Sequence, residues 1–154
     1  ITIAALVLVG CGESASETTI NDAVFRNQIE DVKEWLTDGN DVNSKCIDSG
    51  WTPVHVAARY GVKEAAELLI KNGANINITT GERPSVGKTP LHLAAHPSRR
   101  MGAFVIKRDV STQKKILALL IAKGADVNAK DKAGYTPLHF DDENFKGEAV
   151  KYLV

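Results

Sequence analysis

The sequence predicts an all-α fold built from repeated helix-turn-helix units, and three observations support this prediction. A Thr-Pro-x-His tetrapeptide occurs three times, beginning at Thr52, Thr89 and Thr136. A Gly-x-x-x-Asn motif also occurs three times, out of phase with the first, and its first two copies are 34 residues apart. Apolar residues recur at helical spacing between these motifs. Self-similarity at such a period is typical of a stack of small helical units.

The second unit shows why each helix begins and ends where it does. Thr52 can cap a helix with its hydroxyl group, and Pro53 suits the first helical position because it has no N–H to leave unpaired. Gly61 ends this helix, and Gly73 ends the next one in the left-handed conformation. The apolar faces of the two helices consist of Val54, Ala57 and Ala58, and of Ala65, Leu68, Leu69 and Ile70.

The first and last units depart from this pattern. The first lacks the Thr-Pro start, so we expect an N-terminal cap with one face toward water. In the fourth, Asp141 and Asp142 stand where Ala57 and Ala58 stand in the second. Either the first helix of this unit is frayed or the stack ends imperfectly here, and the acids could alternatively bind a cation. The short segment 148–154 leads us to expect a missing C-terminus with a further repeat or cap.

The motifs resemble those of the ankyrin-repeat family, whose period is about 33 residues. The similarity is clearest in the segment TPLHLA from Thr89 and extends from about Thr19 to the end. It implies an all-α solenoid of about four repeats joined by β-hairpin loops, over about 19–43, 44–77, 78–128 and 129–154, the last truncated. It also implies that the tetrapeptide histidines His55, His92 and His139 are buried hydrogen-bonding residues.

Two insertions break the period in the third repeat. From Asn77 to Thr89 is 12 residues, against nine from Asn43 to Thr52, and Thr89 to Gly124 spans 35 positions against 21 in the second repeat. The longer insertion falls near 97–112. It is basic and apolar, and its possible contact residues are Arg99, Arg100, Phe104, Lys107 and Arg108. Such a loop could bind a partner or anionic lipid headgroups, or be a surface loop without a role.

The first eleven residues are typical of an export signal. They carry no charge and are apolar from Ile3 to Val9. Leu8-Val9-Gly10-Cys11 resembles a bacterial lipobox, which implies a signal peptide over 1–10, lipid attachment at Cys11 and a polar tether over 11–18. A basic segment and an initiator Met are absent, so we expect missing residues before Ile1. The resemblance implies a lipid-anchored protein of the bacterial cell envelope, at the periplasmic side of the outer membrane.

Charge and motif chemistry argue against nucleic-acid binding and nucleotide binding. Lys+Arg and Asp+Glu number 19 each, so the chain lacks the excess of cations that phosphate binding requires. No stretch of about 20 apolar residues could span a bilayer. Gly87-Lys88-Thr89 resembles the end of a phosphate-binding loop, but Glu82 occupies the position of an obligatory glycine.

The sequence also gives little support for a metal site or a catalytic nucleophile. His92 and His96 have a metal-ligand spacing, but Leu93 stands where metal-assisted hydrolysis needs a glutamate, and no third ligand is evident. Cys46 has no nearby His or Asp, so we expect a free surface thiol rather than a nucleophile. We therefore expect no catalytic residues, no cofactor, no metal and no small-molecule substrate.

The remaining expectation is a monomeric, non-enzymatic module that binds a protein partner. Positions just before each Thr-Pro and just after each Ala-Ala pair are not needed for packing in this pattern. They hold aromatic and basic residues of the kind found in interface hot spots, namely Trp51, Arg59, Tyr60, Lys88, His96 and Tyr135. Alternatively, Trp51 and Tyr135 only cover neighbouring hairpins. An alternative function is the interaction part of a larger enzyme or effector whose catalytic domain lies beyond the C-terminus.

Overall fold

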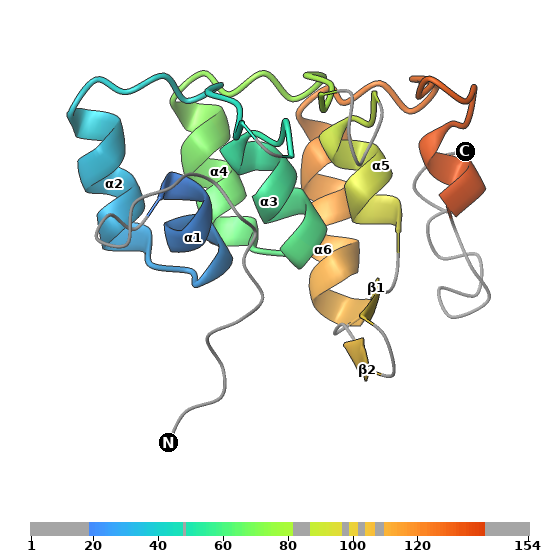
Figure 1. The fold of residues 1–154 in the computed structure, drawn as a ribbon, viewed down its shortest axis with the longest axis horizontal. Coiled ribbons are helices and arrows are strands. Elements are labelled where there is room, and N and C mark those ends of the chain that lie inside the picture. The colour runs from blue at the N-terminus through green and yellow to red at the C-terminus, as the bar shows by residue number, and fades with distance from the viewer. Residues whose placement is uncertain are drawn as a thin grey trace.

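A computed structural model describes residues 19–47, 49–81, 87–96, 99–101, 104–106 and 110–140. Within these ranges the chain forms pairs of short helices that follow one another along the long axis of the molecule (Figure 1). One short two-stranded hairpin accompanies them. The predicted all-α solenoid is thus confirmed.

The helices form two layers. The first layer contains α1 (Ile20–Phe25), α3 (Pro53–Tyr60), α5 (Pro90–Ala95) and the 3-10 helix η1 (Pro137–Phe140). The second contains α2 (Ile29–Thr37), α4 (Lys63–Lys71) and α6 (Val110–Ala122). Each helix contacts its neighbour in its own layer, and α1, α3 and α5 each contact the second-layer helix of the same repeat. Such a layered stack buries the apolar stripe of every helix.

The helix ends follow the sequence pattern. Thr52 and Thr89 are the N-caps of α3 and α5, and a proline follows each at the start of the helix. Gly61 ends α3 with φ +71°, and Gly73 follows the C-cap of α4 with φ +89°. A side chain would be strained at such angles, which is why glycine occupies both positions.

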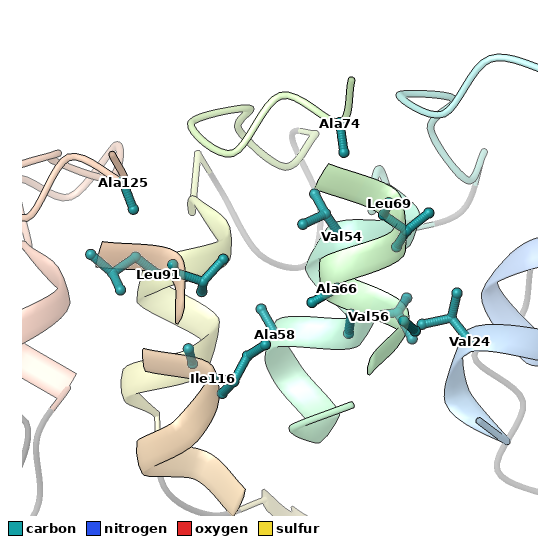
Figure 2. Close-up of a cluster of buried hydrophobic side chains, with 14 of the residues drawn as sticks. Val24, Val54, Val56, Ala58, Ala66, Leu69, Ala74, Leu91, Ile116 and Ala125 are labelled. Carbon is teal, nitrogen blue, oxygen red and sulfur yellow. The ribbon is translucent and has the colours of Figure 1, made fainter. Parts of the chain in front are cut away.

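The core lies between the two layers. Small residues of α3 and α5 are fully buried there and allow the helices to approach closely. Figure 2 shows Val56 of α3 beside Val24 of α1, and Ala58 of α3 toward Ile116 of α6. Leu69 of α4 is also completely buried. One continuous apolar cluster therefore joins all the helices of the two layers from α1 to α6.

The Gly-x-x-x-Asn motifs join consecutive repeats through side-chain hydrogen bonds. Asn43 Oδ1 accepts the N–H of Asn75 at 2.7 Å. In the next repeat Asn77 Oδ1 accepts the N–H of Asp126 at 2.8 Å, and its amide donates to the Gly124 carbonyl at 3.2 Å. The loops that carry these residues run along one edge of the stack (Figure 1). The motif is thus the connection between neighbouring loops.

The longer insertion of the third repeat contains two strands, β1 (Arg99–Met101) and β2 (Phe104–Ile106), which pair antiparallel. Because α6 already begins at Val110, the insertion ends earlier than the expected residue 112. The additional residues lengthen α6 to 13 residues, against nine in α4. Near its beginning the buried side chain of Gln113 donates to the Ala58 and Ala94 carbonyls.

The expectations for both ends of the chain lie outside the described residues. They concern residues 1–18, the acids Asp141 and Asp142, and the segment 148–154. In the part of the fourth repeat that is described, a 3-10 helix stands where α3 and α5 stand in the earlier repeats. Within the described ranges no helix has the length and apolarity needed to cross a bilayer.

Leu69→Ala tests the packing between the layers. The substitution removes a completely buried side chain of α4 and leaves a cavity. We expect the free energy of unfolding to fall by about 2–5 kcal/mol, measured by urea denaturation. Lys71→Ala, on the exposed side of the same helix, should change it by less than about 0.5 kcal/mol. Similar losses in the two variants would contradict this packing.

Candidate functional site: a partner-binding surface

Three hairpin loops place one predicted contact residue each at equivalent positions. In each loop a backbone N–H near its start donates to the carbonyl of the residue before the Thr-Pro pair. The three pairs are Cys46 to Trp51 at 2.8 Å, Thr80 to Lys88 at 2.9 Å, and Asp131 to Tyr135 at 2.9 Å. The sequence placed Trp51, Lys88 and Tyr135 in equivalent positions, and these hydrogen bonds agree.

Neighbouring hairpins touch one another directly. The N–H of Gly81 donates to the Gly50 carbonyl at 3.3 Å. A Cβ atom on Gly50 would lie 2.5 Å from the Gly81 Cα, and Gly50 has φ +63°, so only glycine fits there. A Cβ on Gly87 would similarly lie 3.1 Å from the Lys132 side chain. The hairpins therefore form one connected row.

Side chains within the hairpins fix the backbone at the contact positions. Asp131 Oδ1 accepts the N–H of Tyr135 at 2.9 Å, and Thr80 Oγ1 accepts the N–H of Lys88 at 2.9 Å. In the first hairpin Ser49 Oγ accepts the N–H of Trp51 at 3.3 Å. Each contact residue is therefore held through both its N–H and its carbonyl group.

Two buried histidines connect the first-layer helices α3 and α5 to the hairpin of the following repeat. Nδ1 of His55 accepts the N–H of Thr52 at 3.1 Å, and its Nε2 lies 3.0 Å from the Lys88 carbonyl. A carbonyl only accepts, so the Nε2 must carry the proton and donate it. His92 repeats the arrangement with Thr89 at 3.1 Å and the Tyr135 carbonyl at 2.9 Å. The expected hydrogen-bonding role is confirmed for both.

The third tetrapeptide histidine differs. His139 keeps the contact with the N–H of Thr136 at 3.1 Å, but its side chain is exposed. The expectation of a buried residue is wrong here, because no described residue supplies the carbonyl that Lys88 and Tyr135 supply to the other two. His139 thus makes only the contact within its own tetrapeptide.

Burial keeps the two bridging histidines neutral. It lowers the pKa of His55 to about 4, although the hydrogen bond to the Lys88 carbonyl acts in the opposite direction. Burial also lowers the pKa of His92, opposed by the Tyr135 carbonyl and the charge of Asp131. Because both nitrogens of His92 are used in hydrogen bonds, this ring has no lone pair for a metal ion. No cluster of three or more metal-ligating side chains occurs among the described residues.

Phe140 brings three predicted contact residues together. The Lys88 Nζ lies 4.1 Å from the centroid of its ring, a cation–π contact. The His96 ring stacks on it at 5.8 Å between centroids, and the Tyr135 ring meets it edge-on at 6.1 Å. Sequence reasoning missed Phe140. The available signal was an aromatic residue where Val56 and Leu93 stand in the preceding repeats.

Arg59 is a packing residue, which corrects the expectation that its position is not needed for packing. It is only 7% exposed, and its Nη1 donates to the His96 carbonyl at 3.0 Å. The guanidinium therefore joins α3 to the end of α5. The neighbouring Tyr60 is half-buried and meets Phe25 of α1 edge-on, with 4.5 Å between ring centroids.

Trp51 and Tyr135 differ in exposure. Trp51 is half-buried and packs against the apolar core, and its buried indole N–H has no hydrogen-bond partner among the described residues. Tyr135 is 51% exposed. The alternative that these residues only cover a hairpin thus suits Trp51 better than Tyr135.

The structure also locates the other candidates. Cys46 is buried, so the expectation of a free surface thiol is wrong. Arg99, Arg100 and Phe104 belong to the β1–β2 hairpin. Lys107, Arg108 and Cys11 lie outside the described residues.

Comparison with known proteins agrees with this architecture. A family model described as "Ankyrin repeats (3 copies)" matches residues 20–109. The chain is 30% identical over 122 residues to "Protein phosphatase 1 regulatory subunit 12A" of Mus musculus, covering 79% of this chain and 10% of that protein. It is 39% identical over 92 residues to "Rabankyrin-5" of Homo sapiens, covering 59% and 7%.

A third similar protein is named as an enzyme. "Palmitoyltransferase AKR1" of Lachancea kluyveri is 28% identical over 155 residues, covering 86% of this chain and 20% of that protein. The chain therefore spans a fifth or less of the length of each of these three curated relatives.

The lowered pKa values of the two buried histidines predict how the stability of the fold depends on pH. Folded His55 has a pKa of about 4, against about 6.5 for histidine in an unfolded chain. Between these values the unfolded chain binds a proton that the folded chain does not, so the free energy of unfolding falls as the pH falls. From pH 7 to pH 5 we expect His55 to account for a loss of about 2 kcal/mol. His92 acts in the same direction.

Urea denaturation at pH 7, 6 and 5 measures this loss. His55→Gln should be less stable than the parent at pH 7 but should lose less on acidification, because its side chain does not titrate. His139→Gln, at the exposed position, should keep the pH dependence of the parent. Equal stability of the parent at pH 7 and pH 5 would contradict the prediction.

Proposed function

Because the chain belongs to the ankyrin-repeat family, we propose that it is a monomeric, non-enzymatic module that binds a protein partner. The binding site is the contact surface, defined as Trp51, Tyr60, Lys88, His96 and Tyr135, together with Phe140. The observation that carries this proposal is the cluster of Lys88, His96 and Tyr135 around one phenylalanine ring. The similar regulatory subunit of a phosphatase supports a role in binding rather than catalysis.

The physical character of the surface suits a protein partner. Tyr135 offers a half-exposed aromatic ring, and rigid aromatic residues supply much of the energy of protein interfaces. The backbone of Lys88 and Tyr135 is fixed on both sides, so little conformational entropy is lost when a partner binds. Arg59 contributes by positioning His96. The β1–β2 hairpin is a possible second contact.

We also propose that the protein is a bacterial lipoprotein anchored through Cys11, at the periplasmic side of the outer membrane. The support is the apolar run that closes in Leu8-Val9-Gly10-Cys11.

A second candidate is the interaction part of a larger enzyme or effector. The observation that favours it is the similarity to a palmitoyltransferase of which the chain spans 20%. In that case the repeats would position a substrate for a catalytic domain elsewhere in the longer protein. The sequence of the complete reading frame distinguishes the two candidates.

Substitutions on the contact surface test the binding proposal. Once a partner has been isolated, Tyr60→Ala combined with Tyr135→Ala should weaken binding by about 2 kcal/mol or more, because buried aromatic contacts are lost. The matched control is Glu64→Ala combined with Lys71→Ala, two exposed positions on α4 that leave the net charge unchanged. Titration calorimetry compares the affinities, with helicity checked by circular dichroism. Equal losses would place the site elsewhere, with Arg99–Arg108 as the next candidate.

Metabolic labelling with a radioactive fatty acid in a bacterial host tests the anchor. The parent protein should incorporate label, and Cys11→Ser should not, because the acceptor sulfur is gone. Cys46→Ser is the matched control and should be labelled like the parent. Label in Cys11→Ser at the parental level rules out the lipoprotein proposal.

A further inference from the structure

The two bridging histidines connect the protonation of a buried ring to the position of the contact surface. Nε2 of His55 donates to the carbonyl of Lys88, and Nε2 of His92 donates to the carbonyl of Tyr135. Both acceptors belong to contact residues, and both lie on the hairpin of the following repeat. A change at either ring therefore acts on the backbone of the surface itself.

Protonation of the ring conflicts with the contact at Nδ1 and with the burial of the ring. A neutral imidazole has one donor and one acceptor, whereas the protonated ring has two donors. In His92 the second proton would be on Nδ1, 3.1 Å from the N–H of Thr89, so that two donors would face each other. The Thr89 Oγ1, 2.8 Å away, could accept this proton, but the buried N–H would then lose its acceptor. The Nε2–H would still donate to the Tyr135 carbonyl, and this bond by itself favours the protonated ring, but burial opposes the charge more strongly. A protonated ring is therefore stable only after it leaves its buried position, and leaving that position breaks its bond to Tyr135.

We propose that the contact surface is acid-sensitive: protonation of His92 or His55 releases the hairpin that carries Tyr135 or Lys88, so that the protein holds its partner near neutral pH and releases it in acid. The part that concerns the partner rests on the proposed function. The release of the hairpins does not, because it follows from hydrogen bonds within the chain.

Burial is the main reason why the pKa of each ring is lowered, and neighbouring charges add a difference between the two rings. The ring of His92 lies near Asp131 and Asp126, whose charges favour its protonation, and near Lys88, which opposes it. The ring of His55 lies near the charge of Lys45, which opposes protonation. His92 is therefore protonated first, and the hairpin of Tyr135 is released before that of Lys88.

Amide hydrogen exchange between pH 7 and pH 5, together with an NMR titration of the histidine rings, tests the proposal without a partner. The reporter amides are those of Thr89, which donates to His92, and of Asp131, which donates to Tyr135. The reference amides are Ala74 and Ala125, which donate to Leu69 and Leu120 at helix ends. Protection of the reporters should fall about tenfold more than that of the references. The midpoint should follow the titration of His92.

Two variants separate the ring from other acid effects. His92→Gln keeps a donor and an acceptor that do not titrate, so its reporter amides should respond no more than the references. His139→Gln should respond like the parent, because His139 makes only the local contact. If His92→Gln does not fold, the agreement between ring titration and amide protection in the parent decides the question.

Several results would overturn the proposal. Equal loss of protection at reporters and references would show that acid unfolds the stack as a whole. An unchanged acid response in His92→Gln would show that another group is responsible. A partner that binds equally well at pH 7 and pH 5, despite released hairpins, would overturn the acid-sensitive binding. Failure to isolate any partner, with the amides responding as expected, would count against the proposed function and leave the hairpin release intact.

Discussion

The structure depends on one constraint, which is that each repeat leaves backbone polar groups at its junction with the next. Those at the hairpin end are part-buried, so they need partners. The chain supplies partners with side chains that recur at fixed places in its repeats. Histidine binds a backbone group of the next hairpin, as His55 does with the Lys88 carbonyl. Asparagine binds a backbone group of the next inter-repeat loop, as Asn43 does with the N–H of Asn75. These bonds join the same repeats whose helices share the continuous apolar core.

Much of this could be predicted from the sequence, because the responsible residues have fixed local roles. Thr52, Pro53 and Gly61 act through capping and backbone angles, which neighbouring residues alone determine. The long-range partners could not be predicted in the same way. The bond from Gln113 to Ala58 joins residues 55 positions apart, and no local pattern in an inserted segment indicates it.

For the contact surface, too, only the features that depend on local sequence could be predicted. Equivalent positions of Trp51, Lys88 and Tyr135 followed from the spacing of the motif, because each precedes a Thr-Pro pair. The role of Arg59 did not, since its length allows it to reach the His96 carbonyl on another helix. Phe140 was missed for a related reason. Its ring matters because it contacts residues of neighbouring elements in the stack. A sequence pattern within one repeat does not show those contacts.

The Gln113 side chain has a consequence for how this chain can vary. It binds the carbonyl ends of α3 and α5 from near the start of α6, and thereby fixes where that helix begins. The length of the segment between α5 and α6 therefore does not have to determine where α6 begins. Loop closure entropy grows only slowly with length, so this point is a permissive site. We therefore expect the stack to keep its register when peptides of different lengths are inserted or removed there.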